Sequence, residues 1–396
     1  MLPILAVAFL FCHACTKPSK KEVTKRPEIP ILAWYSIPDG KFATVERYQE
    51  LRDAGFTHSF AHIYSKEAAL RALDLCAQVG IKSMFMCPEL YDSTQQIVRQ
   101  VMNHPGLGGY FLRDEPNNDA LDDLGRWARR IEEIDTVHPC YLNLNPSYAT
   151  CYFPTPEDYR EHLRLFSEKV NLPQLSYDHY PIMKSGDSVT LREDFYLNLE
   201  LIREEANRTN KPFWAFALSS AHYDYPAPTI GHLRLQQYAN LAYGAQLLQY
   251  FTYWAWSDDA LQAPVMMDGQ RSPAYEIVRE MNKEIQNRAH VFHGSKVESV
   301  YHTGSQLPNG TTKLPGLPAH FREFDTMGKG ALVATLTNGS STYIVVQNTS
   351  VNHPIDIRLQ TDDDVLLILR DGSEEQASKY GPLFTLTIGD VLIFRY

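Results

Sequence analysis

The chain has 396 residues and a formal net charge of −10, and 44% of its residues are hydrophobic. This length suffices for one large domain and one smaller domain, and the dispersed, net negative charge excludes a basic face for nucleic-acid phosphates. We therefore expect no nucleic-acid partner. Aromatic residues make up 12% of the chain, which is typical both of sugar-binding proteins and of an aromatic-rich core.

The N-terminal stretch 2–15, LPILAVAFLFCHAC, is apolar but too short to span a bilayer as a mature helix. It resembles a bacterial lipoprotein signal, because Cys15 follows a small residue and precedes a polar, lysine-rich tether. The resemblance implies lipidation at Cys15, secretion across the inner membrane and a lipid-anchored periplasmic or cell-surface protein at the outer membrane. Cleavage to a soluble secreted form is the alternative. We exclude residues 1–26 from the fold.

Strand-like and helix-like segments alternate from Ile31 to Ala289. The pattern predicts strands at 31–36, 57–63, 81–87, 108–112, 140–145, 174–178, 212–219 and 249–256. It predicts helices at 44–54, 66–79, 93–103, 118–134, 156–170, 191–208, 232–246 and 273–289. Eight such units over about 260 residues predict an α/β fold, a closed (β/α)₈ TIM barrel. An open doubly wound sheet is the alternative, but no glycine-rich phosphate loop follows the first strand.

Beyond residue 291 the period changes to short strands separated by turns, as at Asn338-Gly339 and Asp371-Gly372. We expect strands at 297–302, 331–336, 342–348, 355–359, 365–369, 383–388 and 391–396. The pattern is typical of a small antiparallel β-sandwich. The predicted organisation is thus a signal and tether (1–26), a catalytic barrel (27–290) and a β-sandwich (291–396).

The end of the fourth predicted strand has an unusual composition, GGYFLRDEPN at 108–117. Arg113, Asp114 and Glu115 place three charges where a buried strand ends, and Pro116 stops its continuation. Burying charges costs several kcal/mol unless they are paired or used. The stretch is therefore either an ion-paired loop or a catalytic edge.

In a (β/α)₈ barrel the active site lies at the C-terminal ends of the strands, so polar and aromatic residues there are the candidates. The candidate substrate-binding residues are Trp34, His62, Glu89, Arg113, Asn143, Tyr177, His179, Tyr180, Trp214, Trp254 and Trp256. This set has no lysine for a Schiff base, and its histidines do not form a metal-ligand set. We expect no catalytic metal and no cofactor.

Two carboxylic groups in an aromatic-lined cup suit glycoside hydrolysis, which needs one protonated acid and one ionised partner. We predict Glu115 as the acid/base and Asp178, in LSYDHYP, as its partner from another strand. Asp114 would point away from Glu115 on a regular strand, whereas at a turn both could face the pocket. The structural alternatives are an ion pair of Asp178 with Arg113, a supporting hydrogen bond from Glu89, and core packing for any single tryptophan.

The Arg-Asp-Glu-Pro-Asn turn resembles the Asn-Glu-Pro signature of the clan A glycoside hydrolases, in which the Glu is the acid/base. Residues 28–290 resemble bacterial proteins described as glycoside hydrolase family 42-like or β-galactosidase-like. The shared stretches are GYFLRDEP, YLNLNPSYA, LSYDHYP, PFWAFALS and LAYGAQLLQYFTYWAW. The resemblance implies a glycosidase acting on an oligo- or polysaccharide, with Glu115 as its acid/base.

Two departures from clan A leave alternatives open. Asp114 stands where clan A has Asn, and the seventh strand, PFWAFALSS, lacks the nucleophilic Glu. Asp178 or Glu89 would then act as nucleophile or base. The Asp114-Glu115 pair also resembles the substrate-assisted N-acetylhexosaminidases, in which the Asp orients the 2-acetamido group, and chitinase-like barrels carry a Tyr-Asp like Tyr177-Asp178. A non-catalytic surface glycan-binding lipoprotein is the remaining alternative.

Overall fold

The computed structural model describes residues 27–396. The predicted lipidation at Cys15 lies outside the described residues and stays a prediction. Within residues 27–396 no helix combines the length and the apolar character needed to cross a bilayer.

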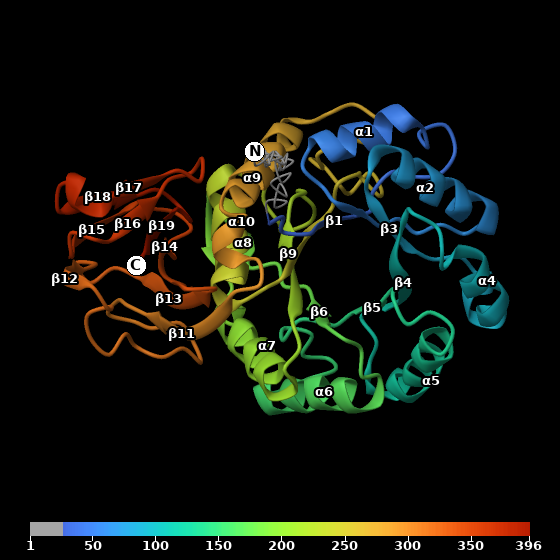
Figure 1. Cartoon of the computed structure of the whole chain (residues 1–396), viewed down its shortest axis with the longest axis horizontal. Helices are drawn as coiled ribbons and strands as arrows, with labels where there is room; N and C mark the ends of the chain where they lie inside the picture. Colours follow the sequence, from blue (N-terminus) through green and yellow to red (C-terminus); the bar gives the residue numbers. More distant parts are fainter. Residues whose placement is uncertain (1–26) are drawn as a thin grey trace, which may run out of the picture.

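Eight parallel strands form a nearly closed barrel in the order β5-β4-β3-β2-β1-β10-β9-β6 (Figure 1). Its strands are β1 (Ile31–Trp34), β2 (His58–Ser59), β3 (Lys82–Phe85), β4 (Leu107–Asp114), β5 (Cys140–Asn143), β6 (Leu175–Tyr177), β9 (Phe213–Leu218) and β10 (Leu247–Phe251). A parallel bridge between Leu144 and Tyr177 joins the two remaining edges, β5 and β6. The predicted (β/α)₈ barrel is therefore confirmed.

Helices surround the barrel, as Figure 1 shows. They are α1 (Val45–Asp53), α2 (Lys66–Val79), α3 (Glu89–Asp92), α4 (Thr94–Val101), α5 (Leu121–Glu132), α6 (Pro156–Lys169), α7 (Phe195–Thr209), α8 (Ile230–Tyr243), α9 (Pro273–Asn287) and α10 (Ala289–Phe292), with a 3₁₀ turn at Asn118–Ala120. Local sequence fixes several ends. Ser65 caps α2, which ends at the left-handed Gly80. Thr155 and Asp158 form a capping box at α6.

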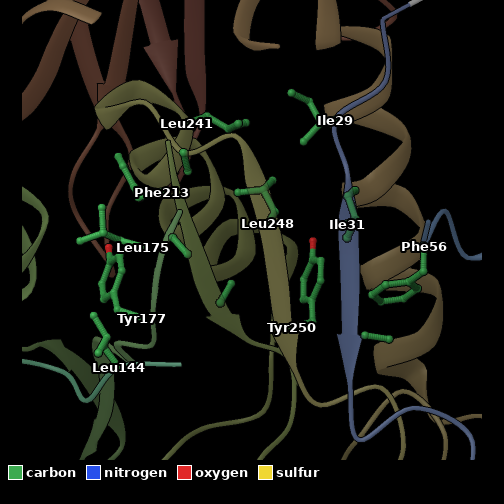
Figure 2. Packing of buried hydrophobic residues seen from close by; sticks show 14 of the residues in the cluster. Ile29, Ile31, Phe56, Leu144, Leu175, Tyr177, Phe213, Leu241, Leu248 and Tyr250 are labelled. Carbon is green, nitrogen blue, oxygen red and sulfur yellow. The ribbon is translucent and has the colours of Figure 1, made fainter. Parts of the chain in front are cut away.

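Alternate residues of each barrel strand serve two different cores. Ile31, Tyr177, Leu248 and Tyr250 belong to the layer between strands and helices (Figure 2). Residues of the opposite parity fill the barrel interior and form a second cluster around Trp34. The Trp34 ring lies 4.4 to 6.1 Å from the rings of Phe60, Phe111, Tyr141 and Phe216. The interior is thus packed with aromatic rings and leaves space only above Trp34.

Antiparallel sheets follow the barrel and form a sandwich-like region, which Figure 1 shows beside α8. Six strands have the order β11-β13-β14-β19-β16-β17, and three have the order β12-β15-β18. Their bounds are β11 (Lys296–His302), β12 (Phe321–Asp325), β13 (Ala331–Asn338), β14 (Ser341–Asn348), β15 (Ile355–Thr361), β16 (Leu366–Ile368), β17 (Glu374–Gln376), β18 (Leu383–Leu386) and β19 (Val391–Arg395). The predicted sandwich is confirmed.

The larger sheet packs on the barrel and does not stand alone. Leu332, Leu336 and Val345 share the core that fills the layer between barrel strands and helices. The Gln347 amide donates to the carbonyl oxygens of Arg234 and Leu235 on α8, each at 3.1 Å. The face of the sheet that is turned to the barrel therefore packs against α8 and supports it.

Some elements differ from the sequence prediction. The second strand covers only His58–Ser59, whereas the sequence predicts a strand at 57–63. The helix predicted at 93–103 corresponds to α4, and the separate helix α3 precedes it. A hairpin of β7 (Ile182–Ser185) and β8 (Ser188–Leu191) was not predicted, and it replaces the first residues expected for the next helix. Strands β12 and β17 were also not predicted. The hairpin matters most, because it follows β6 and stands beside the open end of the barrel.

Candidate active site

A pocket of about 260 Å³ opens at the C-terminal ends of the barrel strands. It is lined by Trp34, Asp114, Glu115, Asn143, Tyr148, Asp178, Tyr180, Phe216, His222, Tyr225 and Phe251. Three of these residues are carboxylic acids and most of the others are aromatic. Among the residues that the structure describes, no lysine or arginine lines this pocket. The pocket is therefore acidic at its polar side and apolar elsewhere.

The end of β4 directs two neighbouring acids into one space. The register between β4 and β5 shifts between Phe111 and Arg113, which marks a bulge. Glu115 then adopts a left-handed backbone, with φ of 42°, while its amide donates to the Asn143 carbonyl oxygen at 2.8 Å. These two irregularities break the strand alternation, so both Asp114 and Glu115 face the pocket.

Asn143 bridges the acids of β4 and β6. Its side-chain amide donates to Asp114 Oδ1 at 3.3 Å and to Asp178 Oδ1 at 3.1 Å. Asn143 is 2% exposed and Asp178 is 6% exposed, whereas Asp114 and Glu115 are open to the pocket. The cluster therefore has a buried base, formed by Asn143 and Asp178, and an accessible rim, formed by Asp114 and Glu115.

The three carboxyl groups hold protons more tightly than isolated acids do. Burial and the neighbouring Glu115 charge raise the pKa of Asp114 to about 7. Burial, Glu115 and Asp114 together raise the pKa of Asp178 well above its usual range. Burial raises the pKa of Glu115, and the contact with Asp178 opposes this shift. Each of these two groups therefore keeps its proton to a higher pH than an isolated acid does.

A cluster around Arg192 supports the wall of the pocket next to Asp178. The Arg192 guanidinium lies 4.2 Å from the centre of the Tyr148 ring. It also donates to the Tyr180 carbonyl oxygen at 3.2 Å and to the Tyr225 hydroxyl at 3.4 Å. Arg192 directly follows β8. The unpredicted hairpin therefore positions the arginine that contacts these three tyrosines.

His222 lies in the pocket lining among aromatic rings, next to Tyr225. Its ring centre is 4.8 Å from that of Tyr225 and 5.0 Å from that of Trp256. Burial lowers the pKa of His222, so this imidazole is neutral at pH 7. It can donate or accept a hydrogen bond, but it supplies no cation to balance the acids.

The structure brings six of the residues predicted from the sequence to the pocket. They are Trp34, Asp114, Glu115, Asn143, Asp178 and Tyr180. Trp256 and His62 lie just outside its lining, where the Tyr35 ring is 5.9 Å from Trp256 and 5.1 Å from His62. They are placed to contact a ligand that extends beyond the pocket.

The other predicted residues lie elsewhere. Tyr177 lies in the layer outside the barrel strands (Figure 2), and Trp254 packs against Phe42 at 4.8 Å between ring centres. Trp214 lies in the barrel interior near the Leu247 end of β10. His179 is buried and contacts Asp194 at 3.2 Å.

Arg113 and Glu89 also lie outside the pocket lining. Arg113 is exposed, and the structure records no ion pair of Arg113 with any described residue. The alternative of an Arg113–Asp178 ion pair is therefore wrong. Glu89 begins α3, and its Oε2 is buried without a hydrogen-bond partner among the described residues.

Five lining residues were not among the predicted site residues. Tyr148, His222 and Tyr225 are on loops after strands, and Phe216 and Phe251 are in strands. The strand alternation that places Trp214 inside the barrel also places Phe216 there, so Phe216 carried a usable signal. His222 also carried a signal, as a polar residue just beyond the seventh predicted strand. Tyr148 and Tyr225 carried none, because sequence spacing does not say how a loop folds over a barrel end.

A group with metal-ligand side chains lies far from this pocket in sequence. His320, Asp362 and Asp364 bring one ligand atom each within 4.8 Å of one another in the sandwich-like region. Arg322 donates to Asp362 at 2.8 Å, so this cluster already has a cation partner. The group is at the surface and is not part of the candidate active site.

Comparisons with known proteins agree with the barrel and its chemistry. Residues 150–288 match the model of glycoside hydrolase family 42, described as beta-galactosidase. This segment contains Asp178 and strands β6 to β10, whereas Asp114 and Glu115 precede it. No curated protein sequence matches the chain.

Two solved structures resemble nearly the whole chain. One is a GH27 β-L-arabinopyranosidase from Geobacillus stearothermophilus, with a TM-score of 0.53, 10% identity and coverage of 93% of this chain and 97% of that chain. The other is an α-L-arabinofuranosidase from Thermotoga maritima, with a TM-score of 0.49, 10% identity and coverage of 95% and 98%. The first supports the fold. With its barrel, its acidic pocket and its family 42 segment, the chain resembles the glycoside hydrolases with a clan A-like barrel, and residues 150–288 are similar to glycoside hydrolase family 42.

Proposed function

We propose that this protein hydrolyses a glycoside of a sugar without an acidic group, with Glu115 as the general acid and base. The observation that carries the proposal is the cluster of Asp114, Glu115 and Asp178 at the open end of the barrel, in which burial raises the pKa of Glu115. A glycosidic oxygen leaves as an alcohol only if an acid protonates it during bond cleavage. Of Glu115 and Asp178, Glu115 is the one that is open to the pocket.

The negative cluster also suits the charge that develops in the reaction. When Glu115 gives its proton to the leaving oxygen, the three carboxyl groups gain one negative charge. At the same moment the sugar gains positive charge at its anomeric carbon. No lysine or arginine among residues 27–396 lines the pocket to cancel the negative charge, so the oxocarbenium-like sugar would be stabilised electrostatically.

Asp178 is the acid that is coupled to Glu115. The Glu115 charge raises the pKa of Asp178, which is 6% exposed and accepts a hydrogen bond from Asn143 at 3.1 Å. We therefore assign Asp178 the role of proton partner to Glu115. A retaining pair of carboxyl groups is separated by about 5–5.5 Å and an inverting pair by about 6.5–9.5 Å, so the stereochemistry of the product would report whether Asp178 also acts as nucleophile or base.

A second candidate is substrate-assisted hydrolysis of a 2-acetamido sugar. All three pocket acids belong to one cluster from β4 and β6, while β10, across the barrel from β4, contributes the apolar Phe251. An acetamido oxygen would then act as the nucleophile in place of a carboxylate of the protein. Asp114, with a pKa of about 7, would hold the acetamido group in place.

Turnover of an aryl-glycoside panel separates the two candidates. The panel contains neutral hexosides and pentosides together with their N-acetylhexosaminide counterparts, all with the same phenol. Turnover of neutral glycosides supports the first candidate, and turnover restricted to 2-acetamido sugars supports the second. Loss of turnover in Asp114→Asn for 2-acetamido sugars alone would identify Asp114 as their orienting residue. Exposed Asp119→Asn is the matched control.

A further inference from the structure

A chain of buried polar side chains runs beneath the pocket and ends at its acids. It starts at Tyr141 on β5, whose hydroxyl donates to Gln249 Oε1 on β10. The Gln249 amide donates to Ser176 Oγ on β6 at 2.9 Å, and the Ser176 hydroxyl donates to Asn143 Oδ1 at 3.1 Å. These four side chains are at most 2% exposed. Polar groups this deep in a barrel are costly unless each has a partner.

In this chain of hydrogen bonds, each side chain after Tyr141 accepts from the residue before it and donates to the residue after it. The Tyr141 hydroxyl occupies the Gln249 oxygen, which leaves the Gln249 amide to donate to Ser176. Ser176 accepts that bond and gives its own proton to the Asn143 oxygen. The Asn143 amide must then face Asp114 and Asp178. If Asn143 were flipped, its oxygen would face two carboxyl groups, and the Ser176 hydroxyl would face an amide donor.

We propose that Ser176 and Gln249 are positioning residues that lock the Asn143 amide, so that it donates to Asp114 and Asp178 at the same time. The proposal rests on the proposed function, because it assigns these residues a role in arranging the acids of that site. The locked amide holds the carboxyl groups of β4 and β6 in fixed positions and favours their ionised forms.

Around these acids, hydrogen-bond donors rather than cationic side chains must stabilise the ionised carboxyl groups. Asp114 faces Glu115 on its own strand, Asp178 from β6 and the Tyr35 hydroxyl after β1. The Asp178 charge also raises the pKa of the phenols of Tyr141, Tyr148 and Tyr180, and those of Tyr159 and Tyr177 in the layer outside the strands. His222 is the remaining titratable group in the lining, and its imidazole is neutral at pH 7. No cationic side chain lines the pocket in the described part of the chain, so Asn143 is the donor that reaches both acids.

The test is a direct titration of the Asp114 carboxyl group by ¹³C NMR in the full chain, with Asp114→Asn to assign the signal. Ser176→Ala removes the hydroxyl that fixes Asn143, and Gln249→Met removes the donor that orients Ser176 at nearly constant volume. Both changes free the amide to turn away. We expect each to move the Asp114 titration upward by about one pH unit from its wild-type value near 7. Ser176→Thr, which retains a hydroxyl, should restore the wild-type titration.

Gln174→Met is the matched control. Gln174 is another buried glutamine of the barrel, 3% exposed, and its amide donates to the Cys140 carbonyl oxygen outside the chain of bonds. It should leave the Asp114 titration unchanged. An unshifted titration in folded Ser176→Ala or Gln249→Met would overturn the proposal, and so would an equal shift in Gln174→Met. The titration needs no turnover, so it is read independently of whether Glu115→Gln abolishes activity.

Discussion

Asp114 and Glu115 are consecutive residues, yet both side chains line the same pocket. A regular strand would send them to opposite faces. The bulge before Arg113 and the left-handed backbone of Glu115 remove that separation. A non-glycine residue at positive φ costs on the order of 1 kcal/mol or more, and such strain is concentrated at functional sites. The local strain therefore serves to place two acids side by side.

The pH dependence of activity should follow the raised pKa values of Glu115 and Asp178. The pKa values of Glu115 and Asp178 are raised, so the acid stays protonated to a higher pH than an ordinary glutamic acid does. Asp114→Asn removes a negative charge that raises the pKa of Asp178. We expect the alkaline limb of kcat/KM to move to lower pH in this variant. If the alkaline limb of kcat/KM stays at the same pH or moves to higher pH, Asp114 does not influence the pKa values of Glu115 and Asp178.

The stability of the fold should also depend on Asp114. Its pKa is about 7 when folded and near 3.8 when unfolded, so between these values the folded chain binds more protons. Its contribution is complete below pH 4 and is lost as the pH rises through 7. Because Asp114 is open to solvent, we expect Asp114→Asn to gain only about 1 kcal/mol over wild type at pH 8. Urea unfolding at pH 4 and pH 8 measures the difference, and equal values at both pH would contradict it.

The pocket should reject acidic sugars. A uronic-acid substrate would bring a carboxylate next to three carboxyl groups without a lysine or arginine in the described lining. We expect kcat/KM for an aryl uronide to be at least about 100-fold below that for the matching neutral glycoside. The ratio should grow above pH 7, where Asp114 ionises. Similar kcat/KM values for the two substrates would be incompatible with the acidic pocket described.

Arg192 should act on substrate binding rather than on bond cleavage. Arg192→Met removes the stacking contact with Tyr148 and the hydrogen bonds to the Tyr180 carbonyl and the Tyr225 hydroxyl. Loss of this support should raise KM by about 5- to 10-fold, with a smaller effect on kcat. Arg279→Met, at an exposed ion pair with Glu276, is the control for loss of one arginine. An unchanged KM in Arg192→Met would exclude a role for this wall.

The barrel and the sandwich-like region should be coupled through α8. The buried pair Arg234–Glu284 joins α8 to α9, and Arg370 before β17 lies 3.8 Å from the same Glu284. Arg234→Met leaves Glu284 with less compensation and should cost about 3–5 kcal/mol of unfolding free energy. The double variant Arg234→Met, Glu284→Leu should recover most of that loss. If the double variant were as unstable as the sum of the single changes, packing rather than charge would explain the effect.

Much of the fold could be predicted because its signals are local. The bounds of α2 were predicted fully, since a serine cap and a left-handed glycine delimit it. The strand order follows from alternating βα units, which need no knowledge of side-chain contacts. By contrast, the β7–β8 hairpin lies between β6 and α7, where the sequence pattern predicts no element for residues 179–190.

The site could be predicted only in part, because some of its residues lie in strands with a local signal and others lie on loops without one. The alternation of side chains within β6 places Ser176 and Asp178 inside and Tyr177 outside, and that rule was available from the sequence. The walls formed by Tyr148 and Tyr225 depend on how loops return over the barrel, and Arg192 contacts both from a third segment. Such long-range contacts have no periodic signal.

The most direct measurement compares wild type with Glu115→Gln on substrates that share one sugar and differ in their leaving group. Good leaving groups depart without protonation, whereas poor ones need the acid. If Glu115 is the general acid, the variant should lose about 10²- to 10⁴-fold in rate on an alkyl or weakly acidic phenyl glycoside and much less on a dinitrophenyl glycoside. Exposed Glu193→Gln, the matched control, should behave as wild type. An equal loss on all leaving groups, or no loss, would contradict the assignment of Glu115 as the general acid.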